Sequence, residues 1–135
     1  MPTLTELEVI CRHGAENGVP QPIIDQIRHN RDCAIAMLEL SREYGITLLC
    51  GTDTGNSPIM QYGQYHGLEM DLLMEHAGLF PQEAIKAATS DNALTFGLEG
   101  KLGALAPGYM ADLIVLKACE LTQPMPFRYG HREAS

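Results

Sequence analysis

The feature that most restricts the fold of this chain is a short apolar segment, Ile46–Cys50, bounded by Gly45 and Gly51. A nearly continuous apolar run of this length is typical of a strand buried on both faces, as in a parallel sheet covered by helices. Helix patterns precede and follow the segment, so the sequence predicts an α/β arrangement. No second strand of this kind is evident, and a lone parallel strand has no partner for its backbone hydrogen bonds. The sequence therefore predicts part of a larger fold.

Helix patterns occupy most of the chain on either side of this segment. The predicted helices, bounded by capping or stop signals, run from 5 to about 17, from near 22, from about 30 to 44, from 67 to 77, from 81 to about 88 and from 90 to 96. Phe80 precedes the helix that starts at Pro81, where Ser or Thr would be the usual cap, so this helix start is expected to be less well satisfied.

Length and charge exclude several classes of protein. The chain has 135 residues, which falls short of the ~250 residues of a typical complete β/α barrel. Its net charge of -8 repels both a phosphate backbone and an anionic membrane, so we expect neither nucleic acid nor a membrane as a partner. Without a leader pattern or a run approaching ~20 apolar residues, the chain is expected to be soluble and cytoplasmic.

The cysteines carry no metal or disulfide pattern. Cys11, Cys33, Cys50 and Cys119 are widely spaced and form no C-x-x-C pair. Neither a zinc knuckle nor a disulfide framework has this spacing, so we expect reduced thiols that are mostly buried.

Asp53 is the candidate catalytic residue, because it follows the predicted strand in the polar loop Gly51–Pro58. In α/β proteins chemistry is concentrated at the C-terminal ends of the strands, and a carboxylate there can bind a cation or move a proton. An aspartate among glycines is also an ordinary turn residue. A third interpretation takes Asp53-Thr54-Gly55 as the triplet of aspartic proteases, in which a homodimer brings two carboxylates together to share one proton. Those proteases are nearly all β, whereas this loop lies between predicted helices.

Several short motifs follow one another between Ala36 and Leu116. They are Glu43-Tyr-Gly-Ile46, Gly51-Thr-Asp53, His66-Gly67, His76-Ala-Gly78, Pro81-Gln-Glu-Ala84 with Ala87-Ala-Thr89, Asn92-Ala93, Gly97-Leu98, Gly103-Ala-Leu-Ala-Pro-Gly108 and Ala111-Asp-Leu-Ile-Val-Leu116. In this order they resemble the C-terminal portion of the amidohydrolase superfamily, closest to its imidazolonepropionase-like and Xaa-Pro dipeptidase-like branch.

The resemblance implies an incomplete fold. Residues 1–100 would be the last β/α units of a TIM-type barrel, mostly helical with one buried strand. Residues 101–118 would be return strands of a small β-sandwich, and residues 119–135 a loosely held tail. Asp112 then has a plain structural role at a turn or strand end. The segment Leu113–Leu116 would leave an unpaired apolar edge.

The resemblance also implies a metal-dependent amidohydrolase that cleaves amide, cyclic amide or dipeptide C–N bonds in a small-molecule or peptide substrate. Asp53 would bind a divalent metal, with zinc expected, and move the proton of the metal-bound water. His66 would lie near bound substrate, or else be a solvated residue at a helix start.

The chain lacks the family's His-x-His pair, so the other metal ligands are expected outside it. The remaining histidines, His13, His29, His76 and His131, are expected to be solvated. By this interpretation the chain is inactive alone and needs the missing barrel half or self-associates. A non-catalytic remnant or interaction module on the same scaffold is the alternative.

Overall fold

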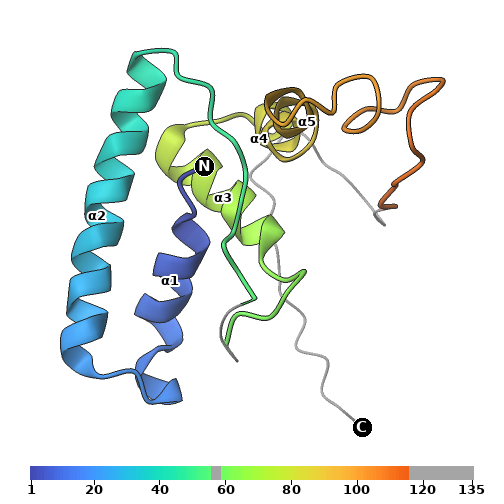
Figure 1. Cartoon of the computed structure of the whole chain (residues 1–135). Coiled ribbons are helices and arrows are strands. Elements are labelled where there is room, and N and C mark those ends of the chain that lie inside the picture. The colour runs from blue at the N-terminus through green and yellow to red at the C-terminus, as the bar shows by residue number, and fades with distance from the viewer. Residues whose placement is uncertain (56–58, 116–135) are drawn as a thin grey trace, which may run out of the picture.

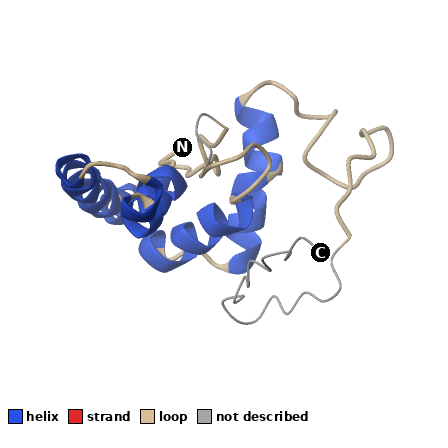
Figure 2. Cartoon of the chain, turned by 90° about the horizontal axis from the view of Figure 1, so that it is seen from below, coloured by secondary structure: helices blue, strands red, loops and turns tan. Residues whose placement is uncertain are grey.

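The computed structural model describes residues 1–55 and 59–115. Its elements in chain order are α1 (Leu4–His13), the 3-10 helix η1 (Ala15–Asn17), α2 (Gln21–Glu43), α3 (His66–Ala77), α4 (Pro81–Ala88) and α5 (Ser90–Thr95). The described residues contain helices, loops and turns but no strand (Figure 2). The expectation that the chain is not a complete barrel is confirmed. No helix within the described ranges is long and apolar enough to cross a membrane.

The first two helices form an antiparallel pair (Figure 1). The helix predicted from 5 to about 17 is interrupted, because α1 ends at His13 and η1 follows it. The backbone N–H of Gly14 still donates to the carbonyl of Ile10 at 2.9 Å, and a Cβ on Gly14 would lie 2.5 Å from that oxygen. Gly18, at φ 80°, ends the turn. The glycine at 14 therefore lets the chain tighten before it reverses toward α2.

The prediction of two helices meeting near Asn30 is wrong, because α2 runs without a break from Gln21 to Glu43. Neither Gly nor Pro lies between Ile23 and Tyr44 to interrupt the helix. Asn30 stays on the surface, where its side-chain oxygen accepts a hydrogen bond from Gln26 at 3.0 Å. The inward side chains on the two halves of α2 continue one stripe at helical spacing; they are Ile24, Ile27, Ala34, Ile35 and Leu38.

The segment 46–50 is corrected from a buried strand to an extended segment without a strand partner. It passes over α3 on its way to the loop at 51–55 (Figure 1). Burial increases along it, from Ile46 at 59% exposed to Cys50 at 5%. A strand is defined by its pairing, and no described segment lies alongside to complete a ladder. The apolar pattern predicted burial along the whole segment, but only its C-terminal end, at Cys50, is buried.

The core lies where α1, α2, α3 and α4 meet the end of this extended segment. Its buried members are Leu4, Leu38, Cys50, Leu72, Leu73, Ala77 and Ala87. The predictions for the last three helices are confirmed to within one residue. At α4 the Glu83 carboxylate accepts the backbone N–H of Phe80 at 2.8 Å, so the missing Ser or Thr cap is offset by the glutamate at the third helical position.

After α5 the described chain forms turns and bends without a strand, and it extends away from the helices (Figure 1). The sandwich strands expected within 101–118 are therefore not found between 101 and 115. Leu113, Ile114 and Val115 are 57%, 89% and 93% exposed, as expected for an apolar edge that lacks a partner. Leu116, the rest of that range and the tail expected at 119–135 lie outside the described residues.

Candidate functional site

The loop that begins at Gly51 follows Cys50, whose backbone N–H and carbonyl are both hydrogen-bonded to helices. The backbone N–H of Cys50 donates to the carbonyl of Ala87 in α4 at 3.1 Å. The carbonyl of Cys50 accepts the side-chain amide of Asn92 in α5 at 2.9 Å. These two bonds attach the end of the extended segment to two successive helices. The position of the loop is therefore set by the packing of α4 and α5.

Within the described part of this loop, residues 51–55, Asp53 is the exposed residue. Its φ is 51°, in the left-handed region that aspartate tolerates better than most residues. On either side of it Thr52 is buried and Thr54 is half-buried, and their hydroxyl oxygens are 2.9 Å apart. Asp53 is the one charged group of residues 51–55 and faces solvent, while the two threonine hydroxyls bond to each other.

The glycines at the two ends of the loop lie against other side chains, and at Gly55 the backbone conformation also favours glycine. A Cβ on Gly51 would lie 2.5 Å from the sulfur of Met1. A Cβ on Gly55 would overlap the ring of Tyr62, and Gly55 also has a φ of 116°. The N–H of Gly55 donates to the carbonyl of Met60 at 2.6 Å. The N-terminal residue and the segment around 60–62 therefore close on the loop from two sides.

His66 is the first residue of α3 and is exposed. Before it, Tyr65 has a φ of 68°, and its hydroxyl donates to the carbonyl of Ile59 at 3.1 Å. This bond fixes the turn from which α3 begins. Within residues 1–55 and 59–115 no hydrogen bond or ion pair joins His66 to Asp53. The structure leaves both predicted side chains accessible without bringing them into contact.

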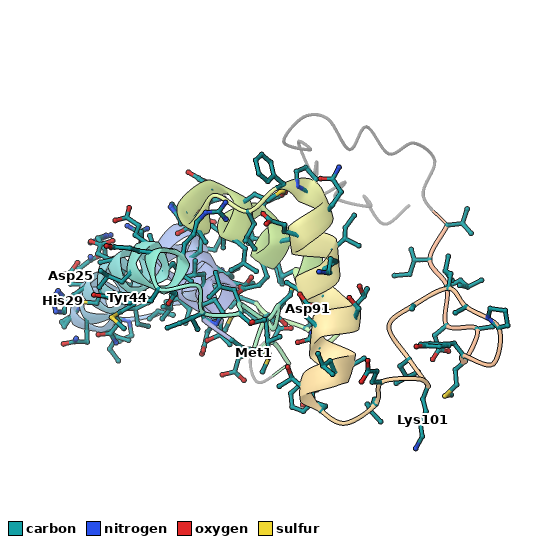
Figure 3. The ribbon with its side chains drawn as sticks, turned by 90° about the horizontal axis from the view of Figure 1, so that it is seen from above. Met1, Asp25, His29, Tyr44, Asp91 and Lys101 are labelled. Carbon is teal, nitrogen blue, oxygen red and sulfur yellow. The ribbon has the colours of Figure 1, made fainter. Side chains whose placement is uncertain are left out.

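The remaining histidines offer little to this loop. His29 lies on α2 at one edge of the molecule, whereas Met1, the residue that packs on Gly51, lies near the middle (Figure 3). His29 is exposed, and its Nε2 is 3.7 Å from the sulfur of Cys33, one helical turn along. His13 is exposed near Glu16, and His76 is half-buried in the last turn of α3. His131 lies outside the described residues.

Glu69 is a buried acid that sequence reasoning missed. It is 0% exposed, and it accepts the backbone N–H groups of Leu4 at 3.3 Å and Thr5 at 2.8 Å, together with the Thr5 hydroxyl at 2.8 Å. Glu69 thereby caps α1 from α3, since Thr3 makes no side-chain cap bond. Burial raises the pKa of Glu69, and the bonds from Thr5 oppose that rise. An acidic residue in the first turn of a helix gives no local signal of this role.

Cys50 lies near this carboxylate and is inert as a thiol. Burial, with a smaller contribution from the charge of Glu69, raises the pKa of Cys50 to about 12. Burial also raises the pKa of Cys11. Cys11, Cys33 and Cys50 are free thiols; Cys33 is exposed, against the expectation of burial.

Asp71 is a second perturbed acid, one helical turn before Glu75 on α3. Burial, and then the negative charge of Glu75, raise the pKa of Asp71 to about 6. One of its carboxylate oxygens, Oδ1, is buried and has no hydrogen-bond partner among the described residues. An unpaired buried oxygen favours the protonated form, which accounts for the direction of the shift.

The donor set for a metal is incomplete in the described residues. No group of three or more His, Cys, Asp or Glu side chains within them could hold a metal ion. A protein zinc site uses three or four protein ligands. Asp53 therefore fits a metal only as one ligand among others, and the described residues by themselves do not form the site.

Comparison with known proteins gives one family. The amidohydrolase family model matches residues 1–131. The ochratoxinase of Aspergillus niger is 40% identical over 74 residues, which cover 54% of this chain and 14% of that protein. The imidazolonepropionase of Shewanella baltica is 30% identical over 107 residues, covering 74% of this chain and 24% of the relative. Adenine deaminase 3 of Rhizobium meliloti is 41% identical over 71 residues, which cover 50% of this chain and 11% of that protein.

The matched stretch therefore spans a quarter or less of the length of each of these relatives. No solved structure matches the chain significantly.

Proposed function

The chain belongs to the amidohydrolase family, and from that premise we propose that it is part of an enzyme that hydrolyses C–N bonds. The observation that carries the proposal is the placement of Asp53. Its carboxylate is exposed in a loop that two bonds at Cys50 attach to α4 and α5. Aspartate is common in exposed left-handed turns, so it is the attachment of the loop to α4 and α5 that distinguishes Asp53 from an ordinary turn residue.

In the proposed reaction Asp53 moves a proton. The oxygen of a water molecule attacks the carbonyl-type carbon of the substrate, and the Asp53 carboxylate accepts the proton that this water loses. As the C–N bond breaks, the proton passes from Asp53 to the leaving nitrogen, and the carboxylate is regenerated. A group that both accepts and returns a proton must stay accessible, and an exposed side chain meets this requirement.

We also propose that Asp53 is one ligand of a divalent metal, with zinc expected. Since the described residues hold no set of three donors, the remaining ligands would come from sequence beyond them. The same reasoning applies to the rest of the site, because the matched relatives are at least four times longer than their matched stretch. We propose that the chain acts together with the rest of a barrel or by self-association.

The substrate in this proposal is a small-molecule amide, cyclic amide or dipeptide. His66 supports this assignment as an exposed side chain at the start of α3, after a turn held by the Tyr65–Ile59 bond. We assign it to substrate binding rather than to proton transfer, since it makes no described contact with Asp53.

The test is a chimera in which this chain replaces the matched segment of the imidazolonepropionase of Shewanella baltica, assayed on that enzyme's own substrate. Asp53→Asn should lower kcat by roughly 10²- to 10⁴-fold with little change in KM, because the amide cannot accept the proton of the attacking water. Asp112→Asn removes an exposed carboxylate elsewhere in the chain and should leave kcat unchanged.

An active chimera in which Asp53→Asn matches the parent would remove Asp53 from the mechanism. A folded but inactive chimera would favour the alternative that the chain is a non-catalytic remnant or interaction module. The aspartic-protease interpretation of Asp53-Thr54-Gly55 has less support, because the described residues around this loop are helical rather than β.

A further inference from the structure

Tyr62 combines high exposure with a contact on the candidate catalytic loop. Its side chain is 84% exposed, among the highest values for a large side chain in the described residues. The ring atoms Cδ1, Cε1 and Cζ nevertheless lie so close to Gly55 that a Cβ at this position would require the ring to move. Gly55 lies two residues after Asp53. An aromatic ring therefore rests against the backbone of the loop and leaves most of its surface to solvent.

Hydrogen bonds on both sides attach the backbone segment that carries this ring. The N–H of Gly55 donates to the carbonyl of Met60 at 2.6 Å, which joins the loop to the segment that carries Tyr62. On the other side, the Tyr65 hydroxyl donates to the carbonyl of Ile59 at 3.1 Å. Tyr62 lies between these two attachments. The cost of ordering a segment for ligand binding is reduced when hydrogen bonds already attach its backbone.

Resting on the proposed function, we propose that Tyr62 is a substrate-binding residue whose ring receives a flat aromatic or heteroaromatic group attached to the scissile amide. A ring offers a planar apolar face to a second ring, and offset or edge-to-face pairs of rings attract each other beyond the area they bury. The phenol hydroxyl adds a polar end. Tyr62 takes no part in proton transfer.

A matched tyrosine shows why exposure alone does not carry this inference. Tyr44 is 76% exposed at the C-terminal end of α2, and isolated exposed apolar side chains are normal on protein surfaces. It lies beyond the last turn of α2, away from the loop at 51–55, and packs on none of its glycines. Tyr62 differs by its contact with Gly55, and Tyr44 is therefore the control position.

The experiment measures binding of two probes to the full chain by NMR. Benzamide is a flat aromatic amide, and cyclohexanecarboxamide is its saturated counterpart of similar size. We expect benzamide to shift the Gly55 amide and the Tyr62 ring signals and to bind roughly 2- to 10-fold more tightly than the saturated probe. Tyr62→Ala should abolish this preference, whereas Tyr62→Phe and Tyr44→Ala should retain it.

Gly55→Ala displaces the ring from the other side of the contact and also strains the backbone at φ 116°, so on both grounds it should abolish the preference. Equal binding of the two probes, no binding of benzamide, or an unchanged preference in Tyr62→Ala would overturn the inference. Circular dichroism confirms that each variant stays folded. Binding requires neither turnover nor a metal, so this result is independent of the Asp53→Asn assay that tests the proposed function.

Discussion

Three acidic residues of this chain occupy three different environments, and the environment decides what each can do. Asp53 is exposed beside two threonines that bond to each other. Glu69 is fully buried among donors from the start of α1. Asp71 has one buried oxygen without a described partner. The first is available for chemistry, the second joins two helices, and the third carries a cost to stability that depends on pH.

Glu69→Gln should lower the free energy of unfolding by about 1–3 kcal/mol, because the amide group of glutamine brings donors toward a site that already consists of donors. Urea unfolding at neutral pH measures the loss. Hydrogen exchange at Thr5 should speed up as the start of α1 frays. Glu39→Gln on the exposed face of α2 is the control and should change neither quantity. Unchanged stability in Glu69→Gln would show that the three bonds do not hold α1 to α3.

Asp71 makes stability depend on pH in a predictable direction. Its folded pKa of about 6 lies above the usual 3.8, so the folded chain binds more protons than the unfolded chain between these values. The contribution of Asp71 to the free energy of unfolding therefore decreases as pH rises through this range. Asp71→Asn should flatten that part of the pH profile and stabilise the chain at pH above the range. Urea unfolding at several pH values checks this.

Asp112→Asn is the control for that profile, since Asp112 is exposed, and it should reproduce the parent slope. Glu75→Gln should reduce the slope in part, because the charge of Glu75 is the second cause of the raised pKa. A profile for Asp71→Asn that superimposes on that of the parent would contradict the assignment.

At the scale of elements, α2 shows how a surface residue can suggest a helix boundary that does not exist. Asn30 favours helix ends in general, but here it bonds to Gln26 across one turn. The inward stripe on both sides of Asn30 packs against α1 and the core, and burial of that stripe outweighs the weak local preference of one asparagine.

Substitutions at Asn30 distinguish one continuous helix from two. In a continuous helix Asn30→Ala should be neutral or stabilise by up to about 0.5 kcal/mol, and Asn30→Gly should be about 1 kcal/mol less stable than Asn30→Ala. At a junction between two helices the order would reverse, because glycine suits a helix end and alanine does not. Urea unfolding of the two variants decides between these outcomes.

At the scale of the whole molecule, the described residues bury one core. After α5, the apolar side chains at 113–115 are left exposed. Ile114 and Val115 are almost fully exposed. Within residues 1–55 and 59–115, no group of three His, Cys, Asp or Glu side chains that could hold a metal ion includes Asp53. Both observations fit a chain that works together with further protein.

Zinc binding tests this view of the site. After dialysis against zinc, the isolated chain should retain well below one equivalent, with no difference between the parent and Asp53→Asn, because one carboxylate falls short of the ligands of a protein zinc site. Elemental analysis gives the ratio. Retention of one or two equivalents that Asp53→Asn abolishes would reveal a complete site and contradict the expectation.

The sequence by itself determined the last three helices and the position of the candidate loop. Gly78, Pro81 and Gly97 act on the backbone next to them, so their effects are readable without the fold. The exposed Asp53 after an apolar segment is likewise a local pattern.

The tertiary structure alone decided that 46–50 is extended rather than paired, and that Glu69 caps a helix that begins 65 residues earlier. Both depend on which distant backbone groups come within hydrogen-bonding reach. A strand needs a neighbouring strand, and a buried carboxylate needs hydrogen-bond donors. Neither the neighbouring strand nor the donors can be identified from the residues next to them in the sequence.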